Sequence, residues 1–381
     1  MRRLATICVA AVAAGCEPPP QAAPCSGGTC SSERTVEQVF QRTQNRSLDI
    51  LFVVDDSAAI APYQADLPAG FATLAGQLAG FPGGVPELHA GFVSASGCAG
   101  SIVTRAGSCG VTPPAQFIDW SWCGQHTDLA GTLDTAFSCL GDFGVTSCTT
   151  SQPLSAMRRV LQQPTPEWAA FLRPDAPLLV VIVAGQDDAS PGPVSDTVQL
   201  LRSLKTDPDN LILVTVIFAP PAGSACAFDP ATAPPRLMEL AKSFGANGLV
   251  DLLCSDGVRN ALLAVSFSLA VFIDPPCLVG VRDNDPATPG VQADCAVGET
   301  TKNYDGSMST TVLPSCDVAA PPCWSLGPSS VFLGCAGGLT FSVTHAADYC
   351  SAEDPLTKIQ CVGCLDPADP ACAAPPLGAA R

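Results

Sequence analysis

Five short and nearly continuous apolar segments, alternating with helical patterns, limit what this chain can fold into. These segments are residues 49–54, 88–93, 178–183, 211–218 and 248–252. Unbroken apolar segments of this length predict strands that are covered on both faces. The helical spacing of apolar residues within 129–140, 237–244 and 258–269 predicts the helices that cover them. We therefore predict an α/β fold over residues 48–272, with a doubly wound and mostly parallel sheet.

The cysteines indicate a second, differently built region and an oxidising compartment. The chain has 20 cysteines among 381 residues, too many for idle thiols in a reducing compartment. Helical periodicity stops near Asp274, and nine of the cysteines fall in the part that follows. We predict a small β-rich domain held by disulfides over residues 273–381. If Cys25 pairs with Cys30, both domains hold an odd number of cysteines, so complete oxidation needs at least one bridge between them.

The N-terminus carries the pattern of an export signal. Arg2 and Arg3 precede an apolar run over residues 4–14, which is too short to span a bilayer but typical of a signal-peptide core. The run ends in Ala-Ala-Gly-Cys at Cys16, which resembles the lipobox of bacterial lipoproteins. That resemblance implies a signal peptide over residues 1–15, a lipid on the Cys16 thiol, and anchoring in the bacterial cell envelope, at the outer membrane or cell surface or facing the periplasm. The alternative is an ordinary signal peptide with an incidental cysteine.

The composition after Cys16 and the overall charge limit the partners. Residues 16–47 begin with a Pro-rich stretch that favours an extended polyproline conformation, so we predict a lipidated tether between the membrane and the folded part. Lys and Arg number 18 against 35 Asp and Glu, which gives a net charge of −17, and no basic block is longer than a pair. Because such a chain offers no basic surface for a row of phosphates, we predict that nucleic acid is not a partner.

Acidic and hydroxyl side chains follow the first predicted strand directly. Residues 48–57 read Leu-Asp-Ile-Leu-Phe-Val-Val-Asp-Asp-Ser and resemble the opening of a von Willebrand factor A domain. In that family, Asp-x-Ser-x-Ser after the first strand forms the metal-ion-dependent adhesion site, and a carboxylate of the partner takes the open position on the metal. Residues 137–161, 171–183 and 184–190 are similar to a bacterial, Cys-bearing lipoprotein branch of the family, so the resemblance spans residues 48–272.

The resemblance implies a cation site at this loop, although several ligand positions differ. The candidate ligands are Asp55, Ser57, Thr146 (or Val145 in its place) and Asp187. Ala59 stands in place of the second serine, and Gly185 stands in place of an aspartate. Since Mg²⁺ and Ca²⁺ depend on several oxygen ligands, we predict a weak or lost site and no certain cofactor. The alternative is that Asp55 and Ser57 cap backbone amides at the end of the sheet.

No pattern of catalytic residues accompanies this loop. The sequence has no Gly-x-Ser-x-Gly elbow, and Ser57 follows two aspartates that oppose formation of an alkoxide. We therefore predict that the protein is not an enzyme but a cell-envelope lipoprotein that binds a protein or surface ligand through its von Willebrand factor A-like domain. The alternative is a structural or envelope-assembly component with no metal-dependent binding.

Overall fold

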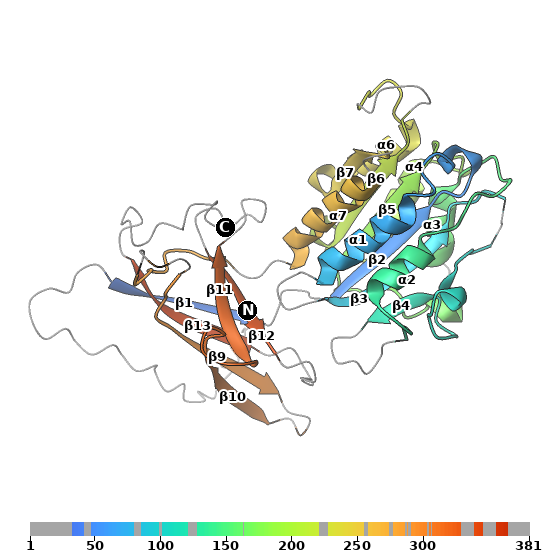
Figure 1. Cartoon of the computed structure of the whole chain (residues 1–381). Helices are drawn as coiled ribbons and strands as arrows, with labels where there is room; N and C mark the ends of the chain where they lie inside the picture. Colours follow the sequence, from blue (N-terminus) through green and yellow to red (C-terminus); the bar gives the residue numbers. More distant parts are fainter. Residues whose placement is uncertain are drawn as a thin grey trace, which may run out of the picture.

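The computed structural model describes residues 33–364 except for short segments within that range. Those segments are residues 42–46, 80–84, 99–100, 121–127, 163, 221–227, 255–257, 274–276, 286–287, 289–290, 303–304, 306, 329–338 and 346–355. The predicted signal peptide, the predicted lipidation site Cys16 and the first half of the predicted tether lie outside the described residues. Figure 1 shows an α/β unit and a separate β-rich unit.

A six-stranded sheet forms the centre of the α/β unit. Its strands are β2 (Ser47–Val54), β3 (Glu87–Ser94), β4 (Phe117–Trp120), β5 (Leu178–Ala184), β6 (Ile212–Phe218) and β7 (Gly248–Leu252). Their order across the sheet is β4-β3-β2-β5-β6-β7. All neighbours pair in parallel except β3 and β4, which are antiparallel. The predicted α/β fold class and the mostly parallel sheet are confirmed.

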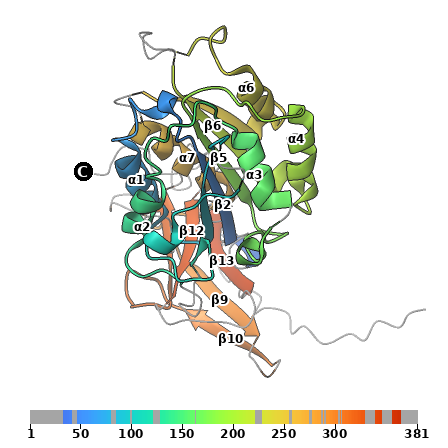
Figure 2. The ribbon, with the colours of Figure 1, turned by 90° about the vertical axis from the view of Figure 1, so that its right-hand side faces the viewer.

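Helices cover both faces of this sheet, as Figure 2 shows edge-on. One face carries α1 (Leu67–Ala79), α2 (Leu133–Leu140) and α7 (Val258–Ile273). The other face carries α3 (Pro153–Gln162), α4 (Val194–Ser203) and α6 (Pro235–Lys242), and the short α5 (Pro208–Leu211) leads into β6. Side chains of a strand alternate between the faces: Phe52 packs in the α1 core, whereas Leu51 and Val53 pack in the α3 core. Both faces of β2 are therefore buried.

The β-rich unit consists of two small antiparallel sheets. The first has the order β1-β13-β9-β10 and the second the order β11-β12-β8. The strands after the α/β unit are β8 (Cys277–Leu278), β9 (Cys295–Lys302), β10 (Met308–Leu313), β11 (Cys323–Pro328), β12 (Leu339–Thr344) and β13 (Leu356–Cys364). A small core of buried residues that includes Val297, Phe341 and Ile359 lies in this unit. A β-rich region held by disulfides was predicted for this part of the chain and is found there.

The first strand, β1 (Glu33–Gln41), belongs to the β-rich unit, although it falls within residues 16–47, for which the sequence predicts a tether. It pairs antiparallel with β13 along its whole length, from Glu33 opposite Cys364 to Gln41 opposite Leu356. Exposure alternates along this strand: Thr35, Glu37 and Val39 are exposed, whereas Val36 and Gln38 are half-buried, as is typical of a strand with one exposed face. The β-rich unit therefore takes strands from both sides of the α/β unit in the sequence.

Disulfides hold loops within each unit. The described pairs are Cys98–Cys148, Cys109–Cys139, Cys295–Cys361 and Cys316–Cys323. Each of these closes within one unit, and the bridge between the units stays a prediction, because many cysteines lie outside the described residues. Disulfides of this number form in oxidising compartments, so the structure supports an exported or extracellular protein. Among the described residues, no helix has the length and apolar character that a membrane span requires.

Candidate functional site

The order of the strands places a candidate site at the carboxyl edge of the six-stranded sheet. Counted along the chain, the six strands have the doubly wound order 3-2-1-4-5-6, which reverses between β2 and β5. The connection after β2 crosses one face of the sheet, and the connection after β5 crosses the other. In such sheets, ligands bind in the crevice between these two connections. The loop after β2 and the loop after β5 meet there, and they carry the candidate ligands Asp55, Ser57 and Asp187.

Asp55 joins the two loops through backbone amides. Its side chain is completely buried. Its Oδ1 accepts a hydrogen bond of 2.9 Å from the amide of Ser57, and its Oδ2 accepts one of 2.8 Å from the amide of Gly185. Both carboxylate oxygens of Asp55 are therefore used to fix the backbone at the point where β2 and β5 end.

A side-chain amide connects a third loop to this site. Nε2 of Gln186 donates to Oγ of Ser57 and to the carbonyl of Thr149, each at 3.1 Å. Thr146 belongs to the same third loop and donates from its amide and its hydroxyl to the carbonyl of Asp56, at 2.7 and 3.0 Å. Ordinary hydrogen bonds thus hold together the three loops that carry Ser57, Thr146 and Gln186.

Asp187 and Asp188 accept hydrogen bonds from amides at the N-termini of helices. The two oxygens of Asp187 accept hydrogen bonds of 3.2 Å from the amides of Arg236 and Leu237 at the start of α6. Oδ1 of Asp188 accepts from the amide of Leu154 in the first turn of α3, and its Oδ2 accepts from the guanidinium of Arg236 at 3.0 Å. Carboxylates satisfy free amides at helix N-termini in this way. Asp187 therefore faces α6, whereas Asp55, Ser57 and Thr146 lie together.

The residues present do not fit the divalent cation that the resemblance implies. Asp55 has no oxygen free of an amide donor, Ser57 accepts from Gln186, and Asp187 caps a helix. Within the described part of the chain, no group of three or more His, Cys, Asp or Glu side chains is placed to hold a metal ion. A weak or lost site stays a prediction, which a titration can test.

Titration calorimetry with Mg²⁺ is expected to show no site tighter than about millimolar, a level typical of oxygen-ligand sites with few charges. The reason is that Ala59 and Gly185 supply no side-chain oxygen, and each carboxylate oxygen of Asp55 already accepts an amide hydrogen bond, which leaves fewer lone pairs for a cation. Micromolar binding that Asp55→Ala abolishes would contradict this expectation. Glu37→Ala, on the exposed face of β1, is the matched control for loss of one carboxylate.

The backbone around Gly185 leaves no room for a side chain at this position, where the resemblance implies an aspartate. A Cβ on Gly185 would lie 2.6 Å from the carbonyl carbon of Ala59 and 2.7 Å from the amide nitrogen of Ile60. Those distances are well inside van der Waals contact, and the atoms in the way belong to the backbone. The loop after β5 therefore packs directly on the loop after β2, and a side chain at 185 requires the two loops to move apart.

Asp56 is a buried carboxylate that the motif did not single out. It is 3 % exposed, and its Oδ1 has no hydrogen-bond partner among the described residues. Burial raises the pKa of Asp56, the charge of Asp55 raises it further, and a hydrogen bond from Ser94 opposes both. The sequence gives no signal for this, because Asp55 and Asp56 are equally acidic residues of one loop.

Asp56→Asn is expected to stabilise the protein at neutral pH by about 1–3 kcal/mol, the cost of a buried unsatisfied polar group. Because the pKa of Asp56 is higher in the folded state, the folded protein binds its proton more tightly. Its contribution to stability is present below the ordinary value of 3.8 and is lost as the pH rises through the folded pKa. The gain in the free energy of unfolding, measured by urea unfolding, should therefore disappear in acid.

The control for Asp56 is Asp134→Asn in the exposed first turn of α2, where hydrogen bonds lower the pKa of Asp134. There the replacement should slightly weaken the fold at neutral pH. A gain at Asp134, or a gain at Asp56 that persists unchanged in acid, would contradict the assignment of a buried, partly unsatisfied carboxylate.

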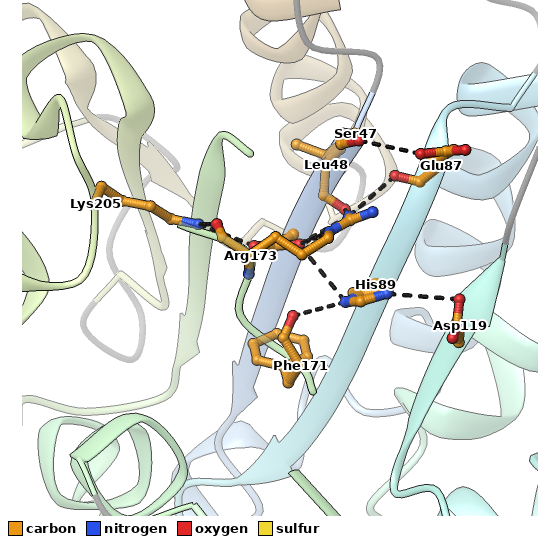
Figure 3. Close-up of polar contacts among 9 residues, drawn as sticks. Ser47, Leu48, Glu87, His89, Asp119, Phe171, Arg173 and Lys205 are labelled. Atoms are coloured by element: carbon orange, nitrogen blue, oxygen red, sulfur yellow. Dashed lines mark hydrogen bonds and ion pairs between the residues drawn. The ribbon is translucent and has the colours of Figure 1, made fainter. Parts of the chain in front are cut away.

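A second polar cluster lies at the opposite, amino-terminal edge of the sheet (Figure 3). Asp49 at its centre is fully buried, and Arg173 and Lys205 both donate to it. His89 lies beside this group: its Nδ1 is 2.8 Å from the carbonyl of Phe171. A carbonyl only accepts, so Nδ1 carries the hydrogen. The cluster joins strands and loops within the unit, and its geometry is that of a structural ion pair.

Comparisons with known proteins find solved structures that resemble this chain at low TM-scores. No protein-family model matches the chain, and no curated protein matches it. Proximal thread matrix protein 1 from the mussel byssus matches in two structures, at 12 % and 11 % identity, each with a TM-score of 0.37. These matches cover 64 % and 65 % of this chain and 52 % and 51 % of those chains.

A third solved structure is the pilus adhesin SpaC from Lactobacillus rhamnosus GG in an open conformation. It matches with a TM-score of 0.36 and 11 % identity, over 87 % of this chain and 41 % of that chain. This chain thus spans about half the length of the solved structures that it matches, or less. Scores this low carry no argument about function, so the von Willebrand factor A identity stays a prediction from the sequence.

Proposed function

We propose that this chain is a lipoprotein of the bacterial cell envelope that binds a protein or surface ligand with its α/β unit, and that it does so without a metal ion and without catalysis. The disulfides support an exported protein. The arrangement at the carboxyl edge of the sheet supports binding without a metal. Hydrogen bonds through Asp55 and Gln186 already join the three loops there.

The observation that carries the proposal is a cavity of about 410 Å³ beside these hydrogen-bonded loops. Its lining includes Ala59, Tyr63, Gln186, Phe218, Pro220 and Pro235. These residues come from the loops after β2, β5 and β6, so the cavity opens where doubly wound sheets bind their ligands. A cavity of this size, mostly apolar with a few polar groups, suits a small part of a ligand, such as one or two side chains of a partner protein.

A photo-cross-linking amino acid at Thr232 tests this surface. Thr232 lines the cavity and is exposed, so the substitution leaves the core intact. Thr135, exposed on α2, is the matched control. In cells that express the full chain, we expect a cross-linked product from residue 232 and none from residue 135. Equal products from both positions would contradict a binding edge, and loss of the product with a chelator would contradict binding without a metal.

Cys16→Ser tests the lipid anchor separately. The variant is expected to leave the membrane fraction, because the predicted acceptor thiol for the lipid is absent. A variant that stays with membranes, together with a wild-type chain that takes up no labelled palmitate, would contradict lipid anchoring at Cys16. The binding proposal would be unaffected by this result.

One observation favours the alternative of an assembly component. β10 ends the four-stranded sheet and has a single partner strand in the described part of the chain, β9. Two of its apolar side chains are exposed, Met308 at 63 % and Val312 at 78 %. Uncovered sheet edges pair with strands of other chains. If this alternative holds, Val312→Lys should abolish assembly, and the yield of the product cross-linked through residue 232 should not change.

A further inference from the structure

A polar groove of about 710 Å³ runs along α3, and it shares no lining residue with the cavity at the carboxyl edge. Arg158 and Arg159 of α3 form part of its wall. The segment after β3 contributes Ser101 and Thr104, and the segment before β5 contributes Thr165 and other residues. Grooves of this volume hold small organic ligands or a few units of a polymer.

The two arginines differ from most other cations of the α/β unit. Arg105, Arg173, Arg202, Lys205 and Arg236 each contact a carboxylate at 3.5 Å or less. Arg158 and Arg159 are partly buried, yet neither pairs with a carboxylate in the described part of the chain. Partly buried charges are costly without a counter-charge. In a chain with a net charge of −17, this leaves a local excess of positive charge at the groove.

Hydrogen bonds to carbonyls hold the guanidinium groups in place. Nη2 of Arg158 donates to the carbonyl of Pro191 at 2.9 Å and to Oγ of Ser155 at 3.4 Å. Nη1 of Arg159 donates to the carbonyl of Ser101 at 3.4 Å. A guanidinium has five N–H donors in a planar fork that matches a carboxylate. The bonds to described residues use a minority of these donors, so both groups are positioned and can still donate.

The rest of the lining determines which anion fits. Gln116, Gln162 and Thr104 offer both donors and acceptors. Glu167 also lines the groove, and a hydrogen bond from Thr165 lowers its pKa, so that it is an ionised acceptor at neutral pH. An ionised Glu167 repels a ligand that carries carboxylates only, such as an acidic peptide segment. It accepts hydrogen bonds from a ligand that carries hydroxyl groups as well.

We propose that this groove binds a uronate unit of an acidic polysaccharide. The carboxylate of the sugar lies against Arg158 and Arg159, and its hydroxyl groups bond to the amides, the hydroxyls and Glu167. Half-buried Ile102 supplies apolar surface in the lining, against which the C–H groups of the ring pack. The proposal is independent of the cavity at the carboxyl edge, since the two sites share no lining residue.

Calorimetry with alginate octamers on the full chain tests the proposal. We expect alginate to bind, and we expect maltoheptaose, a neutral sugar, and octaglutamate, an acidic peptide, not to bind. Binding of alginate should weaken as the salt concentration rises, because the contact is between charges. No binding of alginate, or binding of octaglutamate at least as tight, would overturn the proposal.

Single substitutions locate the site. Arg158→Gln and Arg159→Gln should each weaken alginate binding by roughly 10- to 100-fold, as expected for loss of a charge-assisted hydrogen bond. Arg159→Gln removes only one long bond to a described residue, so its fold is retained even if Arg158→Gln disturbs the contact with Pro191. The control is Arg202→Gln, which removes an exposed arginine that pairs with Asp209. An unchanged affinity in Arg159→Gln, or an equal loss in Arg202→Gln, would overturn the proposal.

Discussion

Replacing Asp49 by alanine is expected to lower the free energy of unfolding by about 3–5 kcal/mol, the range for removing one partner of a buried ion pair. Oδ1 of Asp49 accepts from Nε of Arg173 at 2.8 Å, and its Oδ2 accepts from Nζ of Lys205 at 2.9 Å. The side chain of Lys205 is completely buried. Without Asp49 its ammonium group keeps the hydrogen bond to the carbonyl of Arg173 but loses its ion pair. Urea unfolding at neutral pH measures the loss.

Two comparisons separate this effect from a general loss of a carboxylate. Asp209→Ala removes the exposed pair with Arg202 and should cost less than about 1 kcal/mol. Burial lowers the pKa of Lys205 below its ordinary value of 10.5, so the folded state releases this proton before the unfolded state does. Stability then rises with pH through that window, and the loss in the Asp49 variant should shrink in alkali. A loss equal to that of the control would contradict the assignment.

The five strands predicted as apolar segments share one physical property, which β1 and β4, two strands that were not predicted, lack. The predicted strands from β2 to β7 are apolar on both faces because helices cover both sides of the sheet, and such segments stand out in the sequence. β4 has only four residues, Phe117–Trp120, at an antiparallel edge. β1 is half polar and pairs with a strand more than 300 residues away in the chain. Neither leaves a continuous apolar signal.

The candidate site shows a similar division. The motif located Asp55 and Ser57 correctly at the end of β2, because the position of a loop follows from the strand before it. What the side chains contact depends on loops that lie about 90 and 130 residues further along, at Thr146 and Gly185. The Asp49 cluster is another long-range case, since its partners Arg173 and Lys205 are 124 and 156 residues away. No local spacing indicates such contacts.

Removal of the Cys98–Cys148 disulfide is expected to lower the free energy of unfolding by about as much as Asp49→Ala does. Its cysteines are 50 residues apart in the sequence. In the chain-entropy model, a loop of this length contributes about 4 kcal/mol by restricting the unfolded state. The double variant Cys98→Ala, Cys148→Ala should show this loss in urea unfolding. Cys316→Ala with Cys323→Ala opens a loop with a separation of only 7 residues and should lose less, about 2.5 kcal/mol.

The same disulfide also connects stability to the candidate site. Cys148 lies between Thr146, which donates to Asp56, and Thr149, whose carbonyl accepts from Gln186. The amide of Gly97 donates to the carbonyl of Thr150 at 3.0 Å, so the bridge reinforces a contact between the loop after β3 and this third loop. Without the bridge, amide hydrogen exchange should rise at Thr146 and Gly185 before global unfolding. If exchange rises equally throughout the unit, the bridge stabilises the fold alone and does not organise the carboxyl edge.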